Sequence, residues 1–238
     1  MFKRRKASEA AEPGGSADPT ATQAATDASE RSGSTGDGGD AVSEEPGDPD
    51  TDAEPAEEAL SPRPRGPWDA EEAAGSDERL DLGGLRIRGF DGMQMQVQMD
   101  ESSRAVSLIT LSVDGAAVQI QAFAAPKTSG IWVEVRRQLV SSISASGGLV
   151  EEAAGEYGVE LRAKVPGQGG LQPARFVGVD GPRWFLRGLF LGAAAVPGGS
   201  PVLEDAFRDI VVVRGFEAMA PGDLIPMTLP PEAQASPA

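Results

Sequence analysis

The chain has 238 residues and a formal net charge of −16, and it contains neither cysteine nor histidine. Without cysteine it cannot form disulfides, thiolate nucleophiles or cysteine-ligated metal centres, and without histidine it lacks the commonest general base and metal ligand. The acidic charge disfavours sequence-independent binding to nucleic acid, because that binding relies on Lys and Arg to displace counterions.

Residues 1–66 differ in composition from the rest of the chain. Between residues 7 and 60, fifteen acidic residues stand against one basic residue, Arg31. Such a segment cannot bury enough apolar surface to offset the entropy cost of ordering it. We therefore expect a disordered acidic tail at 1–66, a folded domain at 67–216 and a Pro-rich, partly ordered extension at 217–238.

The tail begins with a basic cluster, Lys3, Arg4, Arg5 and Lys6. No apolar run of signal-peptide type follows it, and no window approaches 18 apolar residues, so we expect a cytoplasmic protein. Near an anionic leaflet, four basic residues at about 1 kcal/mol each would give only weak membrane attachment, which the acidic tail opposes. Binding to a partner and a simple contribution to solubility are the other two interpretations of this cluster.

The first half of the folded part reads as a series of strands that begins after Trp68, which we expect to dock on the domain. One strand alternates between apolar residues and glutamine, the pattern of a half-buried strand, and a later one is apolar at both parities. Asp114-Gly115 predicts a two-residue hairpin turn. The predicted strands span 79–82, 85–88, 93–99, 105–113 and 117–124.

Residues 130–146 form the one long amphipathic helical pattern of the chain. Ser129 is expected to cap its first turn, and Gly147 to end it with a positive φ. We expect this helix to be the main cover of one sheet face. Its apolar side consists of Ile131, Trp132, Val135, Leu139 and Ile143.

The second half predicts two hairpins, a short helix opened by Ser200-Pro201, and a final strand. The order of elements indicates a single α+β domain with a mainly antiparallel sheet of about seven to nine strands. Its main helix lies at about 130–146 and its short helix at about 201–209. The hairpins pair 149–154 with 159–165 and 174–179 with 183–191, and the final strand is 210–213.

Glutamines mark two of the predicted strands. Gln94, Gln96 and Gln98 lie on one face of one strand, and Gln119 and Gln121 lie on one face of another. One interpretation is a solvated sheet face. The other is an uncharged hydrogen-bonding surface for a partner strand or a polar ligand, because uncharged groups are cheaper to desolvate than charged ones.

Three arginines are candidate binding residues. Arg183 and Arg187 share a face of a predicted strand, where they either pair with surface acids or form an anion site. Such a site would take a phosphate-bearing ligand or the acidic tail. Arg136 falls inside the apolar arc of the main helix. Its guanidinium either reaches the edge of the helix or pairs with a carboxylate where helix and sheet meet.

No catalytic constellation is present in the sequence. The serines at 141–146 lack a nucleophile elbow, and the glycine-rich loop at 167–170 lacks the lysine and the helix of a phosphate-binding loop. We expect no catalytic residue, no metal ligand and no cofactor. The sequence favours a non-enzymatic binding or scaffolding protein that acts through protein–protein contact. A small anionic-ligand binder and a peripheral membrane protein are the alternatives.

Several short motifs occur in an order that resembles a known family. They are Met1-Phe2 with the basic cluster, the acidic tail, Gly66-Pro67-Trp68-Asp69 and Arg183-Trp184-Phe185-Leu186-Arg187-Gly188. Over essentially its whole length the chain resembles DUF3710, an actinobacterial family of unknown function. This resemblance implies a cytoplasmic protein and assigns no activity or catalytic residue. Residues 182–214 are similar to the end of Mog1/PsbP-like domains, in which antiparallel sheets between helices mostly serve as binding or assembly modules.

Overall fold

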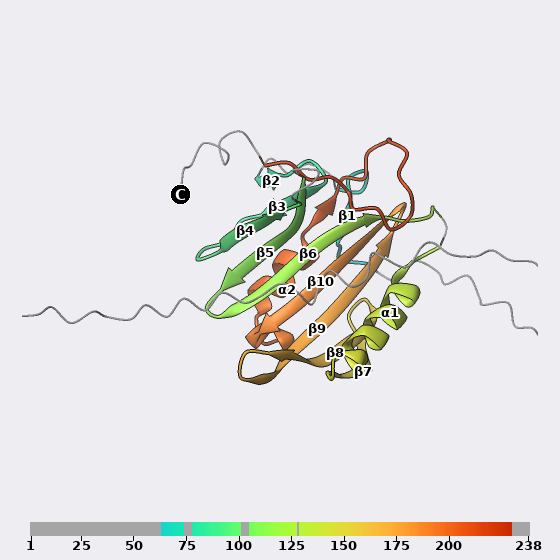
Figure 1. Cartoon of the computed structure of the whole chain (residues 1–238). Coiled ribbons are helices and arrows are strands. Elements are labelled where there is room, and N and C mark those ends of the chain that lie inside the picture. Colours follow the sequence, from blue (N-terminus) through green and yellow to red (C-terminus); the bar gives the residue numbers. More distant parts are fainter. Residues whose placement is uncertain (1–62, 74–77, 101–104, 128, 230–238) are drawn as a thin grey trace, which may run out of the picture.

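The computed structural model describes residues 63–73, 78–100, 105–127 and 129–229 (Figure 1). A seven-stranded sheet contains, in spatial order, β4 (Gln94–Met99), β5 (Val106–Val113), β6 (Ala116–Ala124), β10 (Trp184–Gly192), β9 (Gly170–Gly181), β8 (Gly158–Gly167) and β7 (Leu149–Gly155). A smaller sheet contains β1 (Trp68–Asp69), β11 (Val211–Val212), β3 (Leu85–Arg88) and β2 (Arg79–Asp81). The helices are α1 (Trp132–Ala145) and α2 (Pro201–Arg208), with a 3-10 turn, η2, at Ala193–Ala195.

This arrangement confirms the predicted α+β domain with its mainly antiparallel sheet, main helix and short helix. Every neighbouring pair in the seven-stranded sheet is antiparallel. The smaller sheet was not predicted as a sheet separate from the large one, and it includes one parallel pair, β1 with β11. The backbone N–H of Trp68 donates to the carbonyl of Ile210 at 2.8 Å, so Trp68 does dock on the domain.

Two hairpin turns have the backbone that their sequences predict. Asp114 and Gly115, between β5 and β6, have positive φ angles of 48° and 76°, as both central residues of a type I′ hairpin turn require. Between β9 and β10, Pro182 is followed by Arg183, which has a φ of 66°. A non-glycine residue at such an angle is unusual, and here it lies in a tight turn directly before the buried Trp184.

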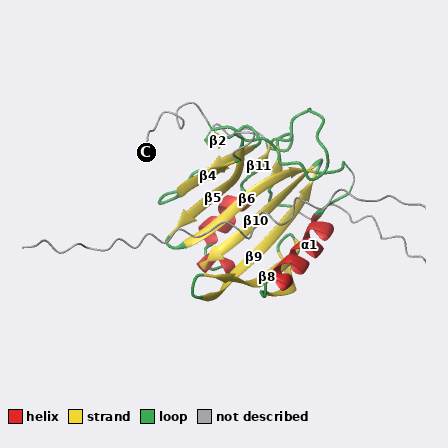
Figure 2. Ribbon diagram, viewed as in Figure 1, coloured by secondary structure: helices red, strands yellow, loops and turns green. Residues whose placement is uncertain are grey.

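Strand β10 separates two hydrophobic cores, because its successive side chains point to opposite faces of the sheet. Trp184, Leu186 and Phe190 lie in the core that α2 and the smaller sheet cover, whereas Phe185 lies in the core under α1. The two helices therefore pack on opposite faces of the large sheet, with α2, labelled in Figure 1 and drawn in red in Figure 2, behind β6 and β10.

Helix α1 is held on the sheet by Trp132. The indole stacks on Phe185 with ring centroids 5.8 Å apart, and its Nε1–H donates to the carbonyl of Val159 at 2.7 Å. Gly178 of β9 makes this approach possible, since a Cβ there would lie 2.2 Å from Cδ2 of the indole. The glycine is therefore required by the close contact between helix and sheet.

The beginning of α1 differs from the prediction. Ser129 makes no side-chain cap to the helix. The buried carboxylate of Asp180, at the end of β9, accepts the N–H of Ile131 at 2.9 Å and the N–H of Trp132 at 3.3 Å. A carboxylate from a distant strand thus satisfies donors that Ser129 was expected to satisfy, and it suits the positive end of the helix dipole. At the other end, Gly147 has a φ of 79°, as predicted.

The Pro-rich stretch after β11 returns to the domain. Ile225 donates to the carbonyl of Ala122 in β6 at 2.9 Å, Val106 of β5 donates to Met227 at 3.2 Å, and Thr228 donates to Leu82 at 2.9 Å. Both Ile225 and Met227 are buried in the core under α2. The core therefore includes side chains beyond residue 216, where the sequence pattern places the end of the domain.

An ion-pair cluster joins the smaller sheet to the end of α2. The carboxylate of Asp209, which follows α2, accepts from Arg79 of β2 at 2.6 and 3.1 Å and from Arg88 of β3 at 2.9 Å. Burial acts to raise the pKa of Asp209, but the hydrogen bonds from Arg79 and Arg88 outweigh it and bring the pKa below its ordinary value.

The helix cap gives a first testable prediction. We expect Asp180→Ala to lower the free energy of unfolding by about 1–2 kcal/mol, because the first N–H groups of α1 lose their acceptor. Ser129→Ala is the matched control and should change this free energy by only a few tenths of a kcal/mol. Urea denaturation of both variants measures the difference, and equal losses would contradict the assignment of the cap to Asp180.

The Asp209 cluster gives a prediction about pH. A carboxyl group whose pKa is lower in the folded chain stabilises the fold above its ordinary pKa, and that stabilisation is lost as the pH falls through the folded-state pKa. We therefore expect the free energy of unfolding of Asp209→Asn to fall less steeply than that of the unaltered chain below about pH 4. Asp114→Asn, at an exposed turn, is the control and should keep the original slope.

Candidate functional site

Helix α1 covers only part of its face of the large sheet. It packs on β7, β8 and β9, while β4, β5, β6 and much of β10 carry no helix on that face within the described part of the chain. Cross-strand partners run across this uncovered region, from Gln96 to Thr110, then Gln119, then Leu189. We call it the open face, and it consists of Gln94, Gln96, Gln98, Leu108, Thr110, Ser112, Ala117, Gln119, Gln121, Phe123, Arg187, Leu189 and Leu191.

The open face has an unusual composition for so acidic a chain. The sequence contains 37 Asp and Glu residues, yet none of the side chains that make up the open face is acidic. Toward β4 the face is uncharged and polar, and toward β10 it becomes apolar, since Leu189 and Leu191 pack against the core under α1. Strand β4 forms its outer edge, and within the described residues β4 pairs only with β5.

Arg187 is the cation of the open face. Its guanidinium donates to Oε1 of Gln121 and lies over the ring of Phe123, with Cζ 5.4 Å from the ring centroid. Gln121 in turn donates from Nε2 to the carbonyl of Ser107 at 3.1 Å, so the amide is fixed in this orientation. Burial lowers the pKa of Arg187 to about 10.

Arg187 differs from most other arginines in its pairing. Ten of the described arginines form an ion pair with an Asp or Glu side chain. Within the described part of the chain, Arg183, Arg187 and Arg214 form none. The exposed end of Arg214 donates to a backbone carbonyl, that of Glu217. Arg187 is thus a partly buried charge without a carboxylate among the described residues.

The structure brings some of the predicted site residues together and separates others. All five glutamines, Gln94, Gln96, Gln98, Gln119 and Gln121, share the open face with Arg187. Arg183 lies in the β9–β10 turn, and no contact between described residues joins it to Arg187. Arg136 pairs with Glu152 of β7 at 2.9 Å where helix and sheet meet, which was one of its two interpretations. Lys3, Arg4, Arg5 and Lys6 lie outside the described residues.

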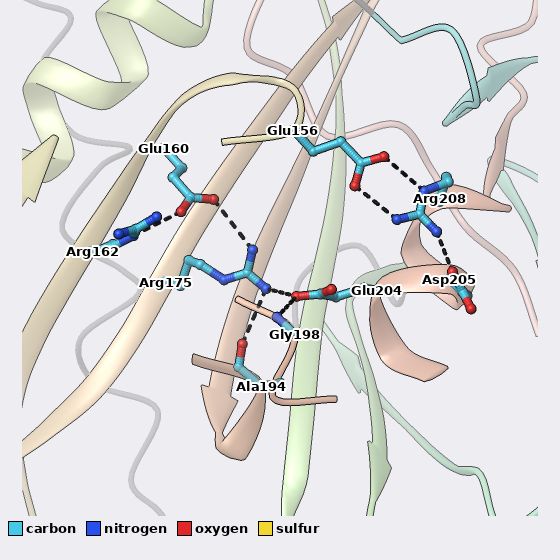
Figure 3. Close-up of polar contacts among 9 residues, drawn as sticks. All are labelled: Glu156, Glu160, Arg162, Arg175, Ala194, Gly198, Glu204, Asp205 and Arg208. Carbon is cyan, nitrogen blue, oxygen red and sulfur yellow. Dashed lines mark hydrogen bonds and ion pairs between the residues drawn. The ribbon is translucent and has the colours of Figure 1, made fainter. Parts of the chain in front are cut away.

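A second polar site lies on the opposite face of the sheet, around Arg175 of β9 (Figure 3). Arg175 is only 6% exposed. Its NH2 group donates to Oε1 of Glu204 in α2 at 2.6 Å and to the carbonyl of Ala194 at 3.3 Å, and its NH1 group approaches Glu160 of β8 at 3.4 Å. One guanidinium therefore connects two strands, the η2 turn and a helix.

The carboxylates around Arg175 have further partners. Glu160 is 4% exposed and also accepts from Nε of Arg162 at 3.0 Å. Glu156, in the β7–β8 turn, accepts from Arg208 of α2 at 2.8 and 3.0 Å. The hydrogen bond from Arg208 is the main cause that holds the pKa of Glu156 below its ordinary value. The turn is thereby fixed against α2.

Between this turn and α2 lies a pocket of about 140 Å³. Its mouth is exposed, at Glu156 and Pro197, and its floor is buried and apolar, at Val177, Phe190 and Phe207. Tyr157 packs edge-on against Phe207 with ring centroids 5.9 Å apart. The charged groups on the wall are Glu156, Glu160, Arg162, Arg175 and Glu204.

None of the residues that line this pocket is among the binding residues predicted from the sequence. Arg175 was counted within a predicted strand at 174–179, and its signal was available there, because a lone charge among buried apolar residues needs a partner. The identity of that partner was not available, since Glu160 and Glu204 lie 15 and 29 residues away.

Metal-binding clusters and membrane-spanning helices are both absent from the described part of the chain. No group of three or more acidic side chains there is placed to hold a metal ion. No helix among the same residues is both long and apolar enough to cross a membrane.

Comparison with known proteins identifies a family. The family model described as "Protein of unknown function (DUF3710)" matches residues 66–236. The solution structure of the PsbP protein of Synechocystis sp. PCC 6803 (CyanoP) is a weak structural likeness with 10% identity and a TM-score of 0.36, covering 59% of this chain and 97% of that one. None of the curated proteins matches the chain. Since the DUF3710 match spans every strand and helix described above, the chain belongs to the DUF3710 family of proteins of unknown function.

Proposed function

We propose that the protein is a non-enzymatic binding module that holds a partner protein on its open face. The observation that supports this proposal is that Arg187 forms no ion pair with a carboxylate among the described residues. Its side chain is partly buried, and burial lowers its pKa. A charge removed from water without a counter-charge is costly, and a carboxylate supplied by a partner would compensate that cost. The partner proposed here therefore presents an acidic side chain to Arg187.

The glutamines favour the same kind of partner. An amide has two donors and one acceptor group, so it can bond to the backbone or to polar side chains of another chain. Uncharged polar groups are also cheaper to desolvate than carboxylates. Gln94, Gln96 and Gln98 are exposed on β4. Among the described residues β4 has no neighbour on its outer side, so an extended segment of the partner could add a strand there.

Two alternatives from the sequence predict other ligands. A small anionic ligand held by Arg183 and Arg187 would need both side chains at one place, and no contact among the described residues brings them together. Attachment to an anionic membrane through Lys3, Arg4, Arg5 and Lys6 depends on residues outside the described part of the chain. The composition of the open face favours the protein partner, in keeping with a cytoplasmic binding module.

The partner proposal predicts which substitutions abolish capture. A tagged full-length chain, expressed in its own cells, is recovered with its bound proteins, and these are quantified by mass spectrometry. If the proposal is right, recovery of one protein, the partner, should fall at least about tenfold with each of two substitutions. Arg187→Gln removes the charge-assisted hydrogen bond, and Gln96→Glu adds an acidic side chain to the open face. The matched controls on the exposed side of α1, Arg137→Gln and Gln138→Glu, should retain it.

The pattern across the four variants decides the result. A protein lost equally from all four, or retained by all four, contradicts docking on the open face. Self-association of the full-length chain that Gln96→Glu abolishes would make a second copy the occupant. Binding of inorganic phosphate to the unaltered chain that Arg187→Gln abolishes, with no protein showing the pattern, would favour the small anionic ligand.

The proposal also predicts a contrast in stability between two arginines. Arg187→Met should change the free energy of unfolding by less than about 1 kcal/mol, because no described carboxylate loses its counter-charge. Arg175→Met should lower it by about 3 kcal/mol, because Glu160 and Glu204 lose the cation they share. Chemical denaturation of both variants measures this. A large loss with Arg187→Met would indicate that Arg187 serves the fold instead of a partner.

A further inference from the structure

The pocket between the β7–β8 turn and α2 contains two buried donors without an acceptor. The Nε–H of Arg175 is buried and makes no hydrogen bond among the described residues, although both terminal groups of the same guanidinium are bonded. The hydroxyl of Tyr157 is likewise buried and has no acceptor for its proton there, since Arg208, which lies near its oxygen, can only donate. Buried polar groups are nearly always satisfied, so two unsatisfied donors around one pocket indicate a missing acceptor.

The protonation states of these groups make them donors. An arginine keeps its proton at neutral pH, so its Nε–H can only donate. Burial raises the pKa of Tyr157, and the phenol therefore also keeps its proton at neutral pH. A molecule that satisfies both groups needs an oxygen that accepts hydrogen bonds.

The charges on the wall favour an uncharged molecule. Three carboxylates, from Glu156, Glu160 and Glu204, line the pocket with only two guanidinium groups, from Arg162 and Arg175. Both guanidinium groups already form ion pairs with these carboxylates. Glu156 is paired with Arg208 outside the lining, so every carboxylate of the wall already has a guanidinium partner. A charged molecule, whether an anion or a cation, would have to displace one of these ion pairs to find a counter-charge.

The size and the floor of the pocket define the rest of the molecule. A volume of about 140 Å³ is close to the roughly 150 Å³ cavity that holds one benzene ring. The floor of Val177, Phe190 and Phe207 is apolar and suits a carbon ring. From these observations we propose that the pocket binds an uncharged molecule of about one six-membered ring, whose oxygen accepts hydrogen bonds from Arg175 and Tyr157.

The test uses the full-length chain and a set of probes that share one ring. Phenol, toluene, benzoate and benzylammonium are titrated while the Nε–H resonance of Arg175 is followed by NMR. Phenol should shift this resonance saturably. Toluene lacks the oxygen, and the other two carry a charge, so each should bind at least about tenfold more weakly.

Two variants separate the pocket from the rest of the molecule. Tyr157→Phe removes only the hydroxyl, keeps the ring against Phe207, and should weaken phenol binding severalfold without loss of the fold. Arg187→Met, on the other face, should leave phenol binding unchanged, so the result does not depend on the proposed partner of the open face. Absence of a saturable shift with every probe would overturn the site, and equal binding of toluene or tighter binding of benzoate would overturn the recognised chemistry.

Discussion

The burial of the first residues of β10 on both faces of the sheet is the constraint on which the rest of the structure depends. A strand in the middle of a sheet presents alternate side chains to opposite sides, and β10 begins with a fully buried aromatic side chain on each side, Trp184 and Phe185. Each face therefore needs its own cover. The smaller sheet and α2 supply one cover, and α1 supplies the other, so the domain has three layers of unequal width.

The unequal width has a functional meaning. Helix α1 is 14 residues long and lies over one end of the large sheet, whereas the sheet continues for several more strands. On the covered part most sheet side chains are apolar, with Glu152 of β7 paired to Arg136 of α1. On the uncovered part they pass from apolar at β10 to uncharged and polar at β4. The side chains thus change in step with the cover, except at Arg187, which lies at the boundary and is partly desolvated. That exception is why we place the partner there.

Local patterns were sufficient for most elements of the fold. The alternation of Met and Gln in β4, the Asp114-Gly115 turn and the amphipathic run of α1 each depend on residues close in sequence, and each has the predicted form. The cap of α1 was predicted wrongly because Asp180 lies about 50 residues along the chain from the amides whose hydrogen bonds it accepts. The parallel pairing of β1 with β11 escaped prediction for the same reason, since two-residue strands have no periodicity to recognise.

The two candidate sites differ in the same way. The glutamines could be assigned to one surface because strand alternation places Gln94, Gln96 and Gln98 on one side. The network around Arg175 could not be assembled, because its members come from β8, β9, the η2 turn and α2. A lone buried charge in a sequence indicates that partners exist, whereas only the tertiary structure shows that they surround a pocket.

The segment that contains Ile225 and Met227 has a consequence for how the protein folds during translation. It bonds to the start of β5, to the end of β6 and to Leu82, between β2 and β3, so it joins parts of the chain synthesised more than a hundred residues earlier. During translation those strands leave the ribosome without the segment that completes them. The domain can close only when nearly its whole length has emerged, and an incomplete nascent chain would expose apolar surface to chaperones and proteases.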